Sequence, residues 1–265
     1  MPSLATPVQQ LPLEDVAYLY DGTLEGLLSA VFLAYERHER PLDVVKEAQY
    51  EPRLGQSSIF VETDFGKAKR VRSGICRVAG SRTFETVKLA SLSDDYQAGT
   101  SIYRFIRYVM ARPADLAGAP VLDELSNPVV SDVCKLAKHV SNEAENMRQF
   151  VRFSHLENGV WYSHIRPNAS VVPLVMGYFS SRLNDQAFII FDDRHRIAGV
   201  YDGRRWQLVS ADALDVPAAT EHDGQMQEAW RRFYDALSID ERYNPELRRH
   251  FMPVRLWDDL PEMST

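Results

Sequence analysis

The sequence predicts an α+β protein with a helix-rich N-terminal half and an antiparallel sheet in its C-terminal half. Two observations predict this fold class. Apolar residues recur at helical spacing through much of the first 151 residues, and from about residue 152 their spacing changes to two. The chain has 265 residues, of which 45% are hydrophobic and 25% are charged. This composition is typical of a globular protein, and the length permits one large domain or two small ones.

The N-terminal half begins with a short strand-helix-strand unit. Residues 1–13 are rich in Pro and small polar residues, so we expect a flexible tail there. Strands are predicted at 16–20 and 57–62, and the helix between them follows Asp21-Gly22-Thr23 and ends before Pro41. Such a unit can form a right-handed parallel crossover. Three more helices are expected in this half, at 65–80, 83–92 and 100–111.

A Pro/Gly/Ala-rich stretch at 112–120 is the best linker candidate, and it divides the chain into subdomains 14–112 and 121–265. The second subdomain begins with a long amphipathic helix at 131–151. A hairpin around Asn158-Gly159 follows, because Asn-Gly favours a tight turn between strands. The remaining predicted elements are a helix at 170–182, a three-strand meander at 187–192, 196–201 and 205–209, and helices at 226–237 and 244–251.

The charge is unevenly distributed. The net charge of −7 excludes a protein that coats nucleic acid by bulk charge, yet residues 65–112 alone carry 10 basic and 3 acidic side chains. This block is a candidate surface for a polyanion such as DNA, with Arg70, Arg104 and Arg107 as the residues in contact. Alternatively, it pairs internally with the acidic flanks or forms a solvated helix face.

The signatures of common cofactor and hydrolase sites are absent from the sequence. The two cysteines, Cys76 and Cys134, form no CxxC pair, and the chain contains no GxG, P-loop, HExxH or GxSxG motif. We therefore expect no cofactor and no metal site. No apolar run reaches the roughly 18 residues that span a bilayer, and no signal peptide opens the chain, so we expect no membrane contact and a cytoplasmic location.

Glu143 is the most informative residue of the 131–151 helix. It falls inside the apolar stripe formed by Leu136, Val140 and Met147. A carboxylate that faces a core must be paired, neutralised or used in chemistry. Glu143 is thus a candidate general acid or base with His139 or an arginine as partner, or it forms a structural ion pair; we favour the structural interpretation.

Other polar residues of the second half allow two interpretations each. Asp192 and Asp202 are candidate catalytic carboxylates, but both lie where turns are expected, and Asp is common in turns for local hydrogen-bonding reasons. Lys135, Lys138 and Arg152 on the outer side of the 131–151 helix could contact DNA phosphates or merely solvate the helix.

Arginines alternate with aromatic residues near the C-terminus, where Arg255 and Trp257 follow Pro253. This pattern suits contact with a nucleic-acid backbone and base stacking. It suits a docked segment equally well. We expect docking, with Arg255 paired to a carboxylate for which Asp192 and Asp202 are possible partners.

Taken together, these segments resemble a bacterial family of DNA metabolism proteins over nearly the whole chain, from Tyr18 to about Glu262. The segments that carry the resemblance are Tyr-Leu-Tyr-Asp-Gly-Thr-Leu-Glu-Gly-Leu-Leu (18–28), Gly99-Thr-x-Ile-Tyr103, Lys135-Leu-x-Lys-x-Val-Ser-x-Glu-Ala144, Arg152-Phe, Leu156-Glu-Asn-Gly-x-x-Tyr162, Ile197-Ala-x-x-Tyr-Asp-Gly203, Asn244-Pro and Phe251-Met-Pro-x-Arg255-x-Trp257. The family positions include Asp21, Glu143, Asp192, Asp202, Arg255 and Trp257. Leu256 departs from an expected aromatic residue, and His155, His164 and His195 do not match.

The resemblance implies a role in DNA repair or DNA metabolism. Genes of this family lie beside a radical-SAM protein similar to spore photoproduct lyase, and related domains are fused to uracil-DNA-glycosylase-type domains. The leading hypothesis is a DNA-binding accessory partner of that radical-SAM protein, since two cysteines cannot ligate the cluster of such an enzyme. The alternatives are a glycosylase-like or other hydrolase with Glu143, Asp192 or Asp202 as base, and a protein-interaction scaffold without DNA contact.

Overall fold

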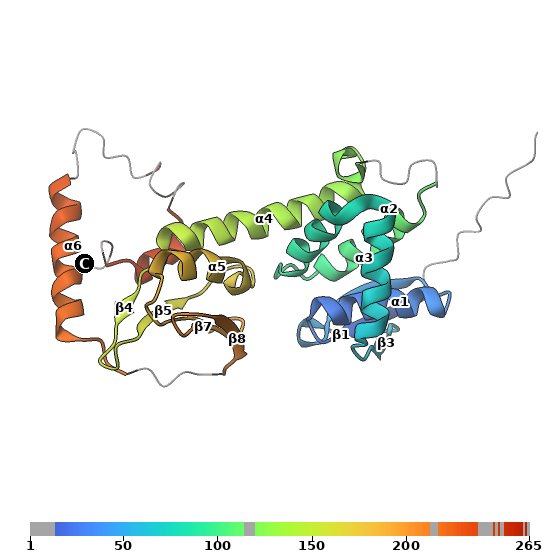
Figure 1. The fold of residues 1–265 in the computed structure, drawn as a ribbon. Coiled ribbons are helices and arrows are strands. Elements are labelled where there is room, and N and C mark those ends of the chain that lie inside the picture. Colours follow the sequence, from blue (N-terminus) through green and yellow to red (C-terminus); the bar gives the residue numbers. More distant parts are fainter. Residues whose placement is uncertain are drawn as a thin grey trace, which may run out of the picture. The chain divides into compact units, whose positions relative to one another are not determined.

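The computed structural model describes residues 14–113, 120–212, 217–237 and 252–261, together with Glu246, Arg249 and Met263. The predicted tail 1–13, most of the predicted linker and most of the predicted helix 244–251 lie outside these residues. The chain divides into two compact units, residues 1–139 and 140–265, and the long helix α4 (Pro128–Phe150) contributes to both (Figure 1). The predicted subdomain boundary at 112–120 stays a prediction.

The first unit is a three-stranded parallel sheet covered by helices. Its elements are β1 (Glu14–Tyr20), α1 (Leu24–Glu36), β2 (Pro41–Lys46), η1 (Glu47–Gln49), β3 (Ser57–Phe60), α2 (Phe65–Ser91), α3 (Ala98–Met110), η3 (Val121–Asp123) and the start of α4. The strand order is β2-β1-β3, and β1 pairs in parallel with both neighbours. The predicted parallel strand-helix-strand unit is therefore present, with β2 as an additional strand.

The two faces of β1 show the alternation of a buried strand. Tyr18 and Tyr20 belong to the core formed with the helices, whereas Ala17 and Leu19 pack with Val45 on the opposite face. Burial on both faces explains why β1 is a nearly continuous apolar run, as is typical of parallel sheets.

Helix α2 joins two predicted helices. Its residues are helical from Phe65 to Ser91 except Gly80, which has φ 83° and ψ 165°. The sequence predicts separate helices at 65–80 and 83–92, and the break between them coincides with Gly80. Only glycine adopts this backbone region readily.

The second unit is built on a five-stranded sheet. Its elements are the end of α4, β4 (Ser154–His155), β5 (Trp161–Ile165), α5 (Val172–Leu183), β6 (Phe188–Asp192), β7 (Ile197–Tyr201), β8 (Trp206–Ser210), α6 (Glu221–Leu237) and η5 (Val254–Asp259). The strands follow one another in chain order across the sheet. The α+β class is confirmed, and so are the hairpin, the helix and the three-strand meander.

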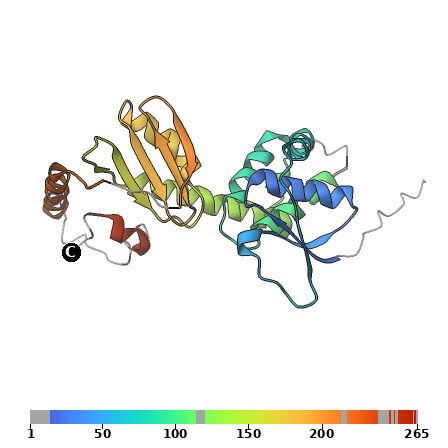
Figure 2. The ribbon, with the colours of Figure 1, turned by 90° about the horizontal axis from the view of Figure 1, so that it is seen from below.

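One strand pair corrects the predicted antiparallel sheet. β5 and β6 are parallel, while the other three pairs are antiparallel, so the sheet is mixed. The physical reason is the connection between the two strands. Helix α5 lies between β5 and β6 in the chain and returns the backbone to the end of the sheet at which β5 began, so β6 runs in the same direction as β5. Figure 2 shows α5 on one face of this sheet, where it packs against β6, β7 and β8.

Gly199 permits the close approach of α5 to β7. A Cβ atom at this position would lie 2.3 Å from the Met176 sulfur and 2.9 Å from Val172. Phe153, just after α4, adds edge-to-face contacts with Phe179 of α5 at 5.2 Å and Phe188 of β6 at 5.6 Å. These contacts join the end of α4, α5 and the sheet into one core.

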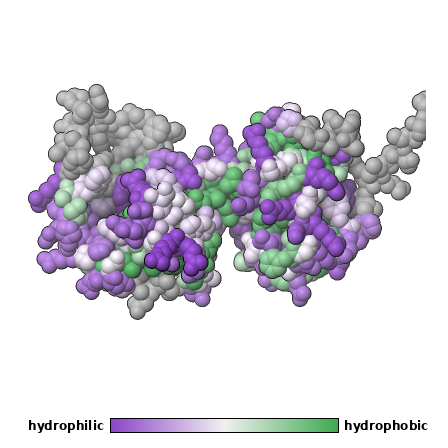
Figure 3. Space-filling view, in the orientation of Figure 1, coloured by the Kyte–Doolittle hydropathy of each residue, from purple (hydrophilic) through white to green (hydrophobic). Residues whose placement is uncertain are grey.

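Polar and charged residues cover much of the visible surface of each unit (Figure 3). None of the helices in the described part of the chain is both long and apolar enough to cross a membrane.

Candidate functional site

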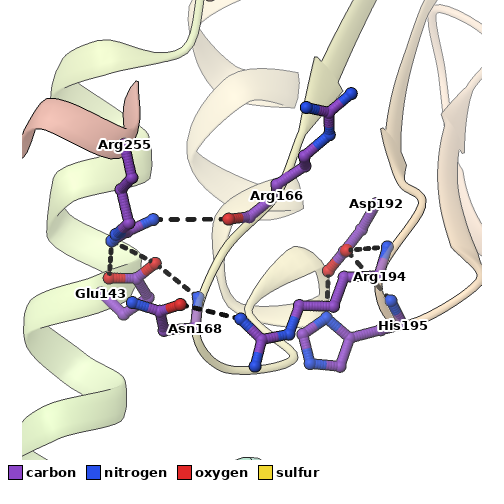
Figure 4. A network of polar contacts seen from close by, with 7 residues as sticks. All are labelled: Glu143, Arg166, Asn168, Asp192, Arg194, His195 and Arg255. Atoms are coloured by element: carbon purple, nitrogen blue, oxygen red, sulfur yellow. Dashed lines mark hydrogen bonds and ion pairs between the residues drawn. The ribbon is translucent and has the colours of Figure 1, made fainter. Parts of the chain in front are cut away.

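Glu143 lies at the centre of a polar network in the second unit (Figure 4). It is 3% exposed. The backbone N–H of Asn168 donates to its Oε1 at 2.8 Å, and Nη2 of Arg255 donates to Oε1 at 2.7 Å and also to Oε2. Nη1 of Arg255 reaches the carbonyl oxygen of Arg166 at 3.4 Å. The predicted buried carboxylate therefore has an arginine partner and a backbone donor.

Asp192 extends the network at the end of β6. It is fully buried, and its Oδ1 accepts hydrogen bonds from the backbone N–H groups of Arg194 and His195, each at 3.1 Å. Its Oδ2 lies 2.6 Å from Nδ1 of His195. Arg194 then donates to the side-chain oxygen of Asn168 at 2.8 Å, which links this turn to the Glu143 contacts (Figure 4).

Asp193, next in the chain, contacts a different pair of side chains. Its Oδ2 lies 2.9 Å from Nε2 of His164 and 3.3 Å from Nε of Arg166. Burial raises the pKa of this carboxyl group, but the hydrogen bonds and charges of His164 and Arg166 outweigh burial, so its pKa lies below the ordinary value.

Asp202 lies apart from this network, in the exposed turn between β7 and β8. Its Oδ1 accepts hydrogen bonds from the backbone N–H groups of Arg204 at 2.8 Å and Arg205 at 2.7 Å, and these bonds lower its pKa. Two of the three predicted catalytic carboxylates, Glu143 and Asp192, are thus brought together. All three make bonds that hold backbone in place, and their catalytic role stays a prediction.

The segment around Arg255 is docked through neighbouring residues as well. Leu256 and Leu260 are 5% and 1% exposed, whereas Trp257 is only half-buried and donates its indole N–H to the carbonyl oxygen of Met252 at 3.1 Å. Leu256 and Leu260 are therefore more deeply buried than Trp257.

The suggested partners of Arg255 are corrected by the structure. Asp192 and Asp202 accept hydrogen bonds from backbone N–H groups of their own turns. The carboxylate that pairs with Arg255 is Glu143. The reason is topological: Glu143 projects from α4 where η5 packs, and no local pattern relates two residues so distant in the chain.

The second unit also contains a large open groove. It encloses about 1420 Å³ and is formed by α4, β4, β5, α5, α6 and the residues after η5. We name it the α4–α6 groove. Its arginines are Arg148, Arg152 and Arg182, and its aromatic residues include Trp161, Tyr162, Tyr178 and Trp230. Glu143, Asp192 and Asp202 do not line it.

Arg148, Tyr178 and Arg182 form a contact cluster on one wall of the groove. The Arg148 guanidinium lies over the Tyr178 ring, 5.9 Å from its centroid, and Nη1 of Arg182 donates to the Tyr178 hydroxyl at 3.3 Å. Arg148 is itself held by Glu145 at 3.1 Å and by the carbonyl oxygen of Leu174 at 3.2 Å. The tyrosine is therefore positioned by two cations.

Helix α6 forms another wall. Asp223, which is buried, accepts the backbone N–H of His155 at 3.0 Å and so fastens α6 to β4. His222, Met226 and Trp230, spaced four residues apart, line the groove on the same stretch of helix. Asp223 also lines the groove, so the residue that anchors α6 is part of the same wall.

The predicted DNA-binding residues fall in different places. Arg152 lines the α4–α6 groove, whereas Lys135 and Lys138 are exposed on the part of α4 that belongs to the first unit. Arg255 and Trp257 belong to the docked segment.

The predicted basic block is partly exposed. Arg70 lines a smaller hollow of about 520 Å³ with Lys69 and Arg77, and Arg104 is exposed on α3. Arg107 is instead packed against aromatic rings, 5.3 Å from the centroid of Tyr35 and 5.7 Å from that of Tyr103.

Most groove residues are missing from the sequence-based predictions, among them Arg148, Tyr178, Arg182 and Trp230. The sequence does indicate that Tyr178 and Arg182 are neighbours, because they lie four residues apart on a predicted helix and so share a face. Nothing in the sequence indicates that Trp230 faces the same space. Among the residues that the structure describes, no three His, Cys, Asp or Glu side chains converge to hold a metal ion.

Comparison with known proteins gives one family. The model of a domain of unknown function, DUF4130, matches residues 96–262, which is more than half of the chain. No curated protein matches the sequence. The matched range includes every residue that lines the α4–α6 groove.

Proposed function

Because the chain belongs to the DUF4130 family, which names a domain but no activity, we propose a function from the chain's own residues: it is a DNA-binding protein that holds DNA in the α4–α6 groove. The proposal extends to DNA repair or DNA metabolism through the resemblance of the sequence to DNA metabolism proteins. In that setting the chain acts as an accessory partner of a radical-SAM protein.

The observation that carries the proposal is the combination of three arginines and several aromatic side chains in one open groove. Arginines bind phosphate oxygens with directed, charge-assisted hydrogen bonds, and aromatic rings stack on bases. The two kinds of contact suit the two parts of a nucleotide. A groove for a small neutral ligand needs neither so many cations nor so much volume.

The positions of the buried carboxylates favour binding over hydrolysis. Glu143 pairs with Arg255 and Asp192 holds the turn after β6, and neither residue lines the groove. A general base must lie within hydrogen-bond reach of the proton it removes. The accessory role therefore has more support than an enzyme that uses these residues.

The test is fluorescence anisotropy with labelled DNA at several salt concentrations. Replacing Arg182 by Gln removes one charge from the groove, so we expect affinity to fall about tenfold at low salt and the salt slope to fall by about 1. The matched control is Arg232→Gln on α6, because Arg232 is exposed, pairs with Glu228 at 3.0 Å and does not line the groove.

Two results would overturn the proposal. One is that neither single-stranded nor duplex DNA binds at low salt. The other is that Arg232→Gln weakens binding as much as Arg182→Gln, because the loss would then reflect net charge and not the groove.

The partner is tested separately, by co-purification of the chain with the neighbouring radical-SAM protein that the family resemblance implies. We expect one complex on size-exclusion chromatography. Separate elution of the two proteins, with and without DNA, would contradict the partnership and leave DNA binding unaffected.

A further inference from the structure

We infer that the α4–α6 groove takes single-stranded DNA, with unpaired bases against Tyr178 and Trp230 and a phosphate at Arg182. This inference rests on the proposed function, since it names the form of DNA that the groove binds. It is argued from the exposure of the aromatic rings, the position of the arginines and the size of the groove.

Two aromatic rings of the groove are exposed. Tyr178 is 39% exposed and Trp230 is 42% exposed, and Met226 beside Trp230 on α6 is 57% exposed. Water contact with such apolar surface is unfavourable, and a flat apolar ligand relieves it. In a duplex both faces of each base are covered by neighbouring bases. Only an unpaired strand offers free base faces to these rings.

Tyr178 is already held in position for stacking. Arg148 lies over its ring and Arg182 contacts its hydroxyl, so the side chain loses little further freedom when a base packs against it. Trp230 comes from a different helix, α6, which Asp223 and Gln227 fasten to β4 by hydrogen bonds to His155 and Ser154. The groove thus offers two fixed aromatic platforms on separate elements.

The arginines supply positive charge close to these platforms. Arg148 is balanced by Glu145, but Arg182 is exposed and forms no ion pair with a carboxylate in the part of the chain that the structure describes. Arg182 donates a hydrogen bond to the Tyr178 hydroxyl. A phosphate bound by Arg182 would therefore lie next to a base that stacks on Tyr178.

The size of the groove agrees with a segment of polymer. About 1420 Å³ exceeds the 300–1,000 Å³ that is typical of pockets for a single small molecule. Proteins that bind single strands cover about 4–16 nucleotides for each module and combine a cationic groove with stacking rings.

The experiment compares a labelled single-stranded oligonucleotide with the same sequence as a duplex, using the full chain. We expect the single strand to bind at least tenfold more tightly. Trp230→Ala and Tyr178→Ala should each weaken single-strand binding about 5- to 150-fold, with the salt slope unchanged, because stacking involves no counterion release. Trp230→Phe and Tyr178→Phe keep a ring and should retain most of the affinity.

The matched control is Trp206→Ala. Trp206 on β8 is 41% exposed, nearly the same as Trp230, but it does not line the groove. Its replacement should leave single-strand binding unchanged. A thermal melt of each variant checks that the fold is intact.

The outcomes separate this inference from the proposed function. Equal or tighter binding of the duplex overturns the single-strand inference, and so do Tyr178→Ala and Trp230→Ala variants that bind like the parent. If Arg182→Gln still weakens binding in that case, the groove contacts only the DNA backbone and the proposed function stands. Absence of any DNA binding overturns both.

Discussion

The hydrogen bonds to Glu143 distinguish it from the exposed acidic residues of α4. Its two oxygens receive donors from Arg255 and Asn168, and its side chain is 4% exposed. Glu145, two residues later, pairs with Arg148 at 3.1 Å but is 55% exposed. Exposed ion pairs contribute little to folding stability because water and salt screen them. Removing one partner of a buried ion pair costs more stability, because the other charge is left buried and uncompensated.

This difference predicts unequal effects of the same substitution at the two sites. Glu143→Gln should lower the free energy of unfolding by about 3 kcal/mol, the lower end of the range for a buried pair, because Arg255 is still 29% exposed. Glu145→Gln should change it by less than about 1 kcal/mol. Urea denaturation at neutral pH measures both, and equal effects would contradict the structural role of Glu143.

The sequence predicts the burial of Glu143 but not its partner. Burial follows from helical periodicity, which places Glu143 among Leu136, Val140 and Met147. The partner does not follow, since Arg255 is 112 residues away and only the packing of η5 on the second unit brings it to α4. Turn residues such as Asp202 are more predictable because their acceptors and donors are local.

At the scale of elements, Gly80 sets the path of α2. Its backbone lies in a region that side chains strongly disfavour, although no atom lies within 4 Å of a Cβ built there. Gly80→Ala should therefore destabilise the protein by about 1–3 kcal/mol through backbone strain alone. Gly177 in α5 has equally open surroundings but no positive φ. Gly177→Ala should stabilise by about 0.5–1 kcal/mol. Thermal melts measure both variants, and melting temperatures that shift in the same direction for Gly80→Ala and Gly177→Ala would contradict this explanation.

Asp21 connects the end of β1 to the loop after β3. It accepts hydrogen bonds from Thr23 and from Thr63, the latter at 2.7 Å. Burial raises its pKa, but these hydrogen bonds outweigh burial and hold the pKa below its ordinary value of 3.8. A carboxyl group with a lowered pKa stabilises the folded state above its unfolded pKa and loses that contribution as the pH falls through the folded pKa.

The lowered pKa of Asp21 predicts how its replacement changes stability with pH. Asp21→Asn should reduce stability by about 1 kcal/mol between pH 5 and 7, and the difference from the parent should shrink below about pH 4. Urea denaturation at several pH values measures it. Thr63→Val, which removes one donor, should reduce the pH dependence of the parent. A difference that grows as the pH falls would rule out the assigned hydrogen bonds.

The elements themselves follow closely from sequence periodicity, with two physical exceptions. β2 is missed because Pro41 indicates the end of a helix, yet proline is also tolerated at the first position of a strand. The parallel pairing of β5 and β6 is missed because strand direction depends on the path of the intervening helix, not on either strand. Both errors concern tertiary arrangement.

At the scale of the whole molecule, positive charge is present in two regions of an acidic chain. One is the α4–α6 groove, and the other is the basic block at 65–112, from which Arg107 is withdrawn by its contacts with Tyr35 and Tyr103. The groove could not be predicted, since its residues come from five elements and the segment after η5. The basic block could be predicted, because its residues are contiguous in the sequence.

The basic block is tested by reversing single exposed charges. Arg70→Glu and Arg104→Glu should each weaken DNA binding at low salt, and the effect should fade as the Debye length shortens to about 8 Å at 0.15 M. Arg204→Glu makes the same change in the exposed turn after β7, outside both the basic block and the groove, and serves as the control. Anisotropy titrations measure all three. Identical losses for Arg104→Glu and Arg204→Glu would assign the effect to net charge.

The Glu143–Arg255 pair also sets an order of events during synthesis. The two residues are 112 positions apart, so at about 5–20 residues per second the ribosome makes Arg255 about 6–22 s after Glu143. Throughout that interval α4 carries a carboxylate whose final partner does not yet exist. Closing the nascent second unit over an unpaired Glu143 carboxylate carries an energetic penalty, so burial of this side chain is favoured only after Arg255 has left the exit tunnel.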